Sequence, residues 1–275
     1  MQQNEFDEAA NGARIVAGRL VGVARPASTP HLIVNFNGYA NRAFAAPHLP
    51  FETYLEGRTK LLQQDAHVIW YAEDNSSWML DHEEPILDKL TAYIVENGIE
   101  QVKILGVSAG GYAALRIGLL IDQRLAAAGR ETAIRAYPIN PQTGFRPQLI
   151  RSTRDEIFSS RWDKRHLGSN PILLEARYQK TYGDRLIDIS ELAATLVPHD
   201  FRAAVFFDRS NPIERVFSGD ITSNELFVAM PQDLRLAHAK GCVAIWESDA
   251  FWATVNADMP FAEAEPRDVE LKRLV

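Results

Sequence analysis

Short apolar runs alternate with amphipathic stretches of helical length along most of this chain. The apolar runs have the length of buried strands, roughly four to eight residues. We expect such strands at 31–36, 66–71, 102–105, 132–137, 201–207 and 225–230. Helical patterns are expected at 51–64, 83–96, 112–125 and 248–255. This alternation predicts an α/β fold, in which right-handed crossovers build a mainly parallel central sheet flanked by helices.

Two segments depart from this alternation. Residues 14–25 predict one or two antiparallel strands at an edge of the sheet, after a polar start that predicts no element. Residues 148–198 are rich in arginine, aspartate and aromatic side chains and predict a small helical cap inserted into a single domain, 1–275. A set of side chains in and just before this region would either meet an acidic or sugar substrate or form a solvated helix face: Arg146, Arg151, Arg154, Arg161, Trp162 and Arg165.

The pattern is sharpest at Gly106-Val107-Ser108-Ala109-Gly110-Gly111, which joins an apolar run directly to a helical one. A strand that turns at once into a helix leaves little room for side chains, and Gly106 and Gly110 relieve that crowding. Such a turn would hold Ser108 in a strained conformation with its hydroxyl pointing outward. The N–H of Ala109, at the helix start, would donate to a developing oxyanion. The alternative is a serine in an ordinary glycine-rich turn.

This strand–turn–helix motif resembles the nucleophile elbow of the α/β-hydrolase superfamily. The resemblance extends over about residues 31–256. It implies the α/β-hydrolase fold, a serine nucleophile and the chain order serine, acid, histidine. The compact layout is also similar to bacterial acyltransferases and esterases associated with surface polysaccharides.

The general base is expected after the last strand, where His238 lies. A serine hydroxyl needs a base within hydrogen-bond reach, and the base needs an orienting acid. His166 and His199 precede the strand at 201–207 and so fall outside the expected order. The alternative for His238 is a surface histidine at a helix start.

The acid and the second oxyanion donor are less sharply defined. Asp208 ends its strand directly and is our first choice for the acid, although it could also cap a turn. Glu214, a few residues further on, is the alternative, and Asp220 is a distant third. The backbone N–H of Gly38 or Tyr39 is expected to complete the oxyanion hole, unless Asn-Gly there only forms a turn.

Composition narrows the possible partners. The net charge is −7 and no lysine or arginine cluster stands out, which argues against nucleic acid or an anionic membrane surface. A single cysteine, Cys242, fits a reducing compartment. A polar N-terminus and the absence of apolar runs of about 20 residues predict a cytoplasmic protein with no membrane span. No metal-ligand spacing occurs, and we expect neither metal nor cofactor.

The combined hypothesis is an enzyme that transfers acyl groups through Ser108. Its substrate would be a small-molecule or carbohydrate ester, with a thioester as a possible acyl donor. Water as acceptor would make it an esterase or thioesterase, and a sugar hydroxyl would make it an O-acyltransferase. The alternative is a non-catalytic binding or scaffold protein of the same fold.

Overall fold

The computed structural model describes residues 6–9, 12–17, 20–37, 64–73, 77–146, 149, 151, 180–236 and 238–257. These residues contain one nine-stranded sheet in the order β1-β2-β3-β5-β4-β6-β7-β8-β9. Its strands are β1 (Phe6–Ala9), β2 (Gly12–Ala17), β3 (Leu20–Arg25), β4 (His31–Phe36), β5 (His67–Glu73), β6 (Gln101–Val107), β7 (Ala133–Ile139), β8 (Phe201–Asp208) and β9 (Phe227–Gln232).

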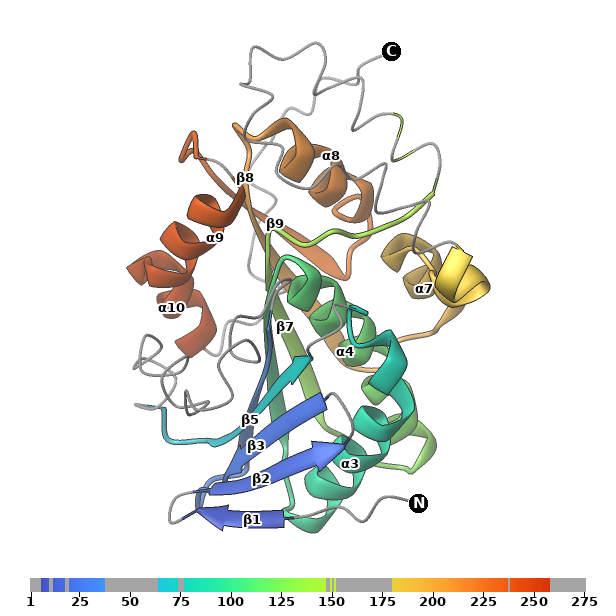
Figure 1. Ribbon diagram of the computed structural model, residues 1–275, viewed down its shortest axis with the longest axis vertical. Coiled ribbons are helices and arrows are strands. Elements are labelled where there is room, and N and C mark those ends of the chain that lie inside the picture. The colour runs from blue at the N-terminus through green and yellow to red at the C-terminus, as the bar shows by residue number, and fades with distance from the viewer. Residues whose placement is uncertain are drawn as a thin grey trace.

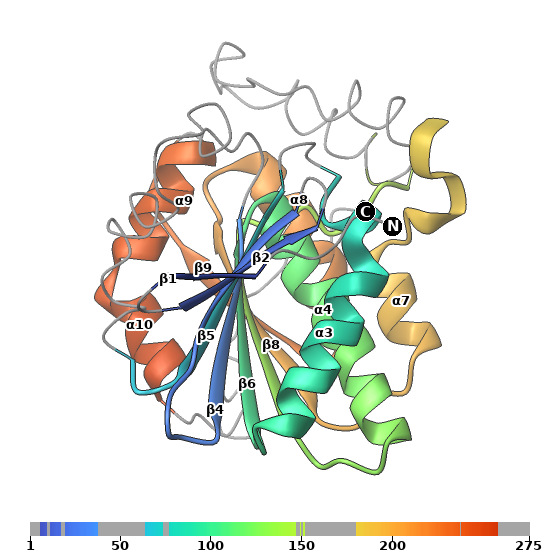
Figure 2. The same ribbon diagram turned by 60° about the horizontal axis from the view of Figure 1, so that its bottom comes forward.

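Helices cover both faces of this sheet (Figures 1 and 2). The helical elements are η1 (Leu80–His82), α3 (Glu83–Glu96), α4 (Ala109–Ala127), η3 (Gly183–Arg185), α7 (Ile189–Thr195), α8 (Pro212–Ile221), α9 (His238–Glu247) and α10 (Asp249–Asn256). Figure 2 shows α3, α4 and α7 on one face and α9 and α10 on the other. No helix in the described ranges is long and apolar enough to cross a bilayer.

The predicted fold class is confirmed. Strands β4 to β9 pair in parallel, and β1, β2 and β3 add an antiparallel edge next to β5. Each expected buried strand is present within about two residues of its expected bounds. Strand β1 lies in the polar start, where the sequence predicts no element. The helix expected at 51–64 and most of the cap expected at 148–198 lie outside the described residues.

Two apolar clusters hold the layers together, one on each face of the sheet. The larger joins α3 and α4 to the sheet, and the smaller joins α9 and α10 to it. Helix α4 is buried on nearly all sides because α3 and α7 contact its outer face. A helix buried on nearly all sides belongs to the core, and α4 therefore holds the turn at its N-terminus rigidly.

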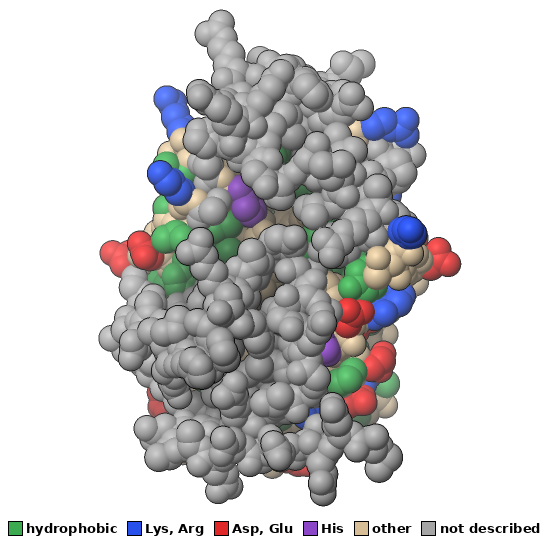
Figure 3. All heavy atoms as spheres, viewed as in Figure 1, with side chains coloured by type: hydrophobic (Ala, Val, Ile, Leu, Met, Phe, Trp, Pro, Cys, Tyr) green, Lys and Arg blue, Asp and Glu red, His purple; other side chains and the backbone are tan. Residues whose placement is uncertain are grey.

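The carboxyl ends of the parallel strands lie at one edge of the sheet, where α/β folds place their sites. Ser108 follows β6, Asn140 follows β7, Asp208 ends β8, and His238 follows β9 after a short loop. On the face drawn in Figure 3, the described acidic and basic side chains lie interspersed around the outline and form no basic patch.

Candidate active site

Ser108 occupies a strained turn between β6 and α4. Its φ of 56° and ψ of −117° lie where side-chain-bearing residues are rare. A Cβ on Gly106 would lie 2.0 Å from the carbonyl oxygen of Gly110, and one on Gly110 would lie 2.3 Å from that of Phe36. The Ser108 N–H donates to Ile139 on the neighbouring strand, at 2.9 Å. The two glycines and this hydrogen bond together impose the conformation predicted for an elbow.

The imidazole of His238 connects the serine to a carboxylate. His238 Nε2 lies 2.8 Å from Ser108 Oγ, and His238 Nδ1 forms a short hydrogen bond with Glu214 Oε1. A carboxylate accepts a hydrogen bond from Nδ1–H, which leaves the lone pair of Nε2 facing the serine hydroxyl. The Glu214 side chain is 2% exposed and that of His238 is 39% exposed. The acid is thus buried behind an imidazole that is accessible from outside.

Glu214 reaches this position because α8 begins almost directly after β8. The Asn211 side chain accepts a hydrogen bond from the N–H of Ile213, at 3.1 Å, and so caps the helix. Pro212 occupies the first turn, where its fixed φ suits a helix start. Glu214 therefore lies in the first turn of α8, close to the end of the sheet.

Asp208, the first choice for the acid from the sequence, has different partners. Its carboxylate accepts hydrogen bonds from the N–H and the hydroxyl of Ser210, at 3.0 and 2.6 Å. It also accepts from the N–H groups of Leu234 and Leu236, at 3.2 and 3.1 Å. Asp208 thus anchors the loop that leads to His238, while Glu214 is the carboxylate that accepts the hydrogen bond from the imidazole.

Cys242 lies next to the imidazole of His238, and Asn140 lies next to Cys242. Neither was assigned a role from the sequence. Asn140 is buried and has a φ of 44°. Its side-chain oxygen accepts from the N–H of Asp208 at 3.1 Å, and its amide nitrogen lies 3.5 Å from Cys242 Sγ. The thiol lies 3.9 Å from His238 Nε2. Cys242 follows His238 by one helical turn, a signal that is visible only if α9 is expected.

The surroundings of His238 act on its pKa in opposite directions. Burial lowers the pKa of His238, but the negative charge of Glu214, and after it Cys242, outweigh that effect. The pKa therefore lies well above its ordinary value. A base with a raised pKa binds a proton from serine more strongly but is free to do so only at higher pH.

The remaining candidates are placed as follows. Ala109 begins α4, and the first N–H groups of a helix have no partner within it. Gly38 and Tyr39 lie outside the described residues, as does His166. His199 precedes β8, at the opposite end of that strand from the serine. Within the described ranges, no three His, Cys, Asp or Glu side chains are grouped to hold a metal ion.

Comparison with solved structures identifies the fold. The carboxylesterase EstE1, cloned from a metagenomic library, superposes with a TM-score of 0.52 at 13% identity, over 92% of this chain and 87% of the esterase. Esterase B from Lactobacillus rhamnosis gives 0.53 at 12%, over 92% and 83%. The capsule O-acetyltransferase of Neisseria meningitidis serogroup A gives 0.53 at 11%, over 92% and 98%.

This protein therefore has the α/β-hydrolase fold that its sequence predicts. No family model and no curated protein sequence matches the chain. At these identities the likeness establishes the fold, and the reaction must be argued from the site itself.

Proposed function

We propose that this protein is a serine-dependent acyl-transfer enzyme that forms an acyl-enzyme on Ser108. The observation that supports this most directly is the hydrogen-bonded chain from Ser108 Oγ through His238 to Glu214. The three side chains come from elements far apart in the sequence, in the order serine, acid, histidine. Nucleophile, base and orienting acid are the parts that acyl transfer by serine requires.

In the proposed first half-reaction, Ser108 Oγ attacks the carbonyl carbon of an ester or thioester. His238 Nε2 accepts the hydroxyl proton, and the Glu214 carboxylate stabilises the imidazolium that results. The N–H of Ala109, together with that of Gly38 or Tyr39, stabilises the oxyanion. The imidazolium then gives its proton to the departing alcohol or thiol, and the acyl group remains on the serine.

In the second half-reaction, an acceptor hydroxyl attacks the acyl-enzyme. His238 accepts the proton of the acceptor and returns a proton to Ser108 Oγ as the oxyanion collapses. Water as acceptor gives an esterase or thioesterase, and a sugar hydroxyl gives an O-acyltransferase. Both kinds of enzyme occur among the structures with this fold. We propose a small-molecule or carbohydrate ester as substrate.

The strained serine favours an enzyme over a binding or scaffold protein. A residue held in a rare backbone conformation costs on the order of 1–3 kcal/mol and persists where the surrounding structure imposes it. Ser108 is held in this way by two glycines and a neighbouring strand. A binding protein gains nothing from this strain, whereas a nucleophile needs it to project its hydroxyl.

Labelling with a fluorophosphonate tests this proposal without knowledge of the substrate. We expect one adduct per chain by mass spectrometry, located on Ser108, and none in Ser108→Ala. Ser223→Ala is a suitable control because Ser223 is exposed in a turn and lies outside the proposed triad. Labelling that persists in Ser108→Ala would refute the assignment. Hydrolysis of p-nitrophenyl acetate, compared with acetyl transfer from a thioester to an oligosaccharide, would then distinguish esterase from transferase.

A further inference from the structure

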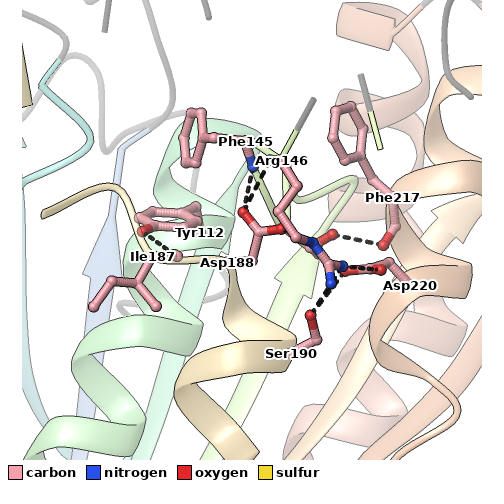
Figure 4. Close-up of polar contacts among 9 residues, drawn as sticks. Tyr112, Phe145, Arg146, Ile187, Asp188, Ser190, Phe217 and Asp220 are labelled. Atoms are coloured by element: carbon pink, nitrogen blue, oxygen red, sulfur yellow. Dashed lines mark hydrogen bonds and ion pairs between the residues drawn. The ribbon is translucent and has the colours of Figure 1, made fainter. Parts of the chain in front are cut away.

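One guanidinium joins three segments that are far apart in the sequence. Arg146, in the loop after β7, forms ion pairs with Asp188, which precedes α7, and with Asp220 near the end of α8 (Figure 4). It also donates to Ser190 Oγ at 3.2 Å, and Ser190 Oγ donates to Asp220 at 3.1 Å. Arg146 thus has two carboxylate partners within the protein, although its side chain is still 44% exposed to solvent.

The loop after β7 also packs closely around the carboxylate of Asp188. Asp188 is buried and accepts hydrogen bonds from the backbone N–H groups of Phe145 and Arg146 (Figure 4). A Cβ on Gly144 would lie 2.6 Å from the carboxyl carbon of Asp188, so the loop approaches this closely only with glycine there. The arrangement fixes Arg146 relative to the end of β7.

A second tether connects this loop to α8. Thr143 Oγ1 donates to the backbone carbonyl of Phe217 in α8, at 2.6 Å. Phe217 and Asp220 lie about one and about two turns beyond Glu214 on this helix. The loop after β7 therefore contacts α8 at two successive turns.

Apolar packing alone gives α8 little support. Among the described residues, Phe217 packs with Leu149, Ile213 and Val216 in a small cluster separate from the two main ones. Ile221, at the end of the helix, belongs to the large cluster. The first turn of α8, which carries Glu214, packs through Ile213 into this small cluster and not into the two main ones, so polar contacts to the helix add to that support.

We propose that Arg146 and Thr143 are positioning residues, which tether α8 through Asp220 and the Phe217 carbonyl and thereby hold Glu214 against His238. This inference rests on the proposed function, because it assigns a role to Glu214. A misplacement of about 1 Å at a catalytic group can reduce the rate on the order of 100-fold. Loss of one of two tethers is expected to have a smaller effect, about tenfold.

The test uses Asp220→Asn and Thr143→Val, singly and together. Asp220→Asn removes the α8 carboxylate that pairs with Arg146 and leaves the Arg146–Asp188 pair intact, so we expect the fold to be retained. The rate at which a fluorophosphonate labels Ser108 is measured as a function of pH. We expect a rate about tenfold lower in each variant, and lower still in the double variant.

The acid limb of the pH profile separates positioning from a merely structural role. The charge of Glu214 raises the pKa of His238, so a loosened contact moves the acid limb to lower pH. Ser108 and Cys242 face the other ring nitrogen and are unchanged in these variants. Asp88→Asn removes an exposed ion pair with Arg124 between α3 and α4 and should leave both rate and limb unchanged.

Parallel measurements on Glu214→Gln separate the two proposals. A lower melting temperature of Asp220→Asn and Thr143→Val, with the acid limb and labelling rate of the wild type, would overturn the positioning role. If Glu214→Gln is strongly impaired in the same assay, the proposed function stands in that case. If Glu214→Gln labels at the wild-type rate, the assigned acid is wrong and the positioning role fails with it.

Discussion

Substitution of Glu214 by glutamine is the most informative single change at this site. Glutamine has the same size as glutamate but carries no charge, and the position is 2% exposed, so water cannot replace the lost carboxylate. The neutral amide can accept a hydrogen bond from the Nδ1–H group of His238 only through its oxygen. With its NH₂ group turned to the ring, the amide places the imidazole proton on Nε2, where Ser108 needs an acceptor.

Two effects determine how much turnover Glu214→Gln should lose. The first is the wrong tautomer, and the second is an imidazolium that forms in the transition state without a counter-charge. Removal of the acid from a serine triad costs roughly 10⁴-fold in turnover, which corresponds to about 5 kcal/mol. We expect Glu214→Gln to lower kcat by about this factor. KM should change little, because Glu214 lies behind the imidazole and not on the side of the serine.

The assay is hydrolysis of p-nitrophenyl acetate or, if that is slow, the rate of fluorophosphonate labelling. Asp208→Asn is the matched control, because it also neutralises a buried carboxylate near His238. It should weaken the hydrogen bonds that anchor the loop and cost about 1–3 kcal/mol of stability, with a smaller loss of turnover. The reasoning is refuted if Glu214→Gln retains turnover within tenfold of the wild type, or if Asp208→Asn is the more damaging change.

Three further predictions concern the elbow and the imidazole. Ser108→Gly should be inactive yet more stable than Ser108→Ala by about 1 kcal/mol in urea unfolding, because glycine adopts a positive φ without strain; equal stabilities would show that the turn is unstrained. Gly106→Ala should lower the melting temperature strongly, since its Cβ would lie 2.0 Å from the Gly110 carbonyl oxygen; an unchanged melting temperature would contradict that clash. The raised pKa of His238 should place the acid limb of kcat/KM above the ordinary imidazole value of about 6.5. The interaction that raises this pKa stabilises the fold fully below that ordinary value, and its contribution should be lost as the pH rises through the folded-state pKa; Glu214→Gln should lack this part of the pH dependence of unfolding, and an unchanged pH dependence in that variant would contradict the pair as its source.

The fold was predictable because its signals are local. Buried parallel strands are short apolar runs, and the elbow needs glycine at Gly106 and Gly110 for steric reasons that the sequence displays. Ser108 and His238 follow strands, so that topology alone brings them to the same edge of the sheet. Strands β7 and β8 separate β6 from β9, so it is the loop after β9 and the start of α9 that bring His238 back to the serine.

The carboxylate that contacts His238 was harder to predict, because the choice between Asp208 and Glu214 depends on α8, a helix that was not expected from the sequence. Asp208 is closer to the end of its strand, and that proximity favoured it. Asn211 and Pro212 start α8 at once, however, and turn Glu214 back toward the sheet. With ten residues, α8 is shorter than the roughly 11–18 residues over which a helical period is usually recognised, and so it was not among the helices expected from the sequence.

The partners of Arg146 could not be inferred from the sequence either. Asp188 and Asp220 lie 42 and 74 residues further along the chain. Ion pairs over such separations are products of the tertiary fold, and a run of arginines is more commonly a solvated surface. The sequence therefore indicated Ser108 and His238, the proposed nucleophile and base, but not the network that surrounds Glu214, the proposed acid.

The positions of Ser108, His238 and Glu214, the proposed triad, have a consequence for how the protein would lose activity on heating. Ser108 lies between the central strand β6 and the buried helix α4, whose amide protons should exchange only through global unfolding. His238 follows β9, the outermost strand at its end of the described sheet, and Glu214 lies on α8, whose Ile213 and Phe217 pack in the small cluster outside the two main ones. A local opening at that edge separates the base and the acid from a nucleophile that stays in place. We therefore expect reversible thermal inactivation at temperatures below the melting transition of the whole domain.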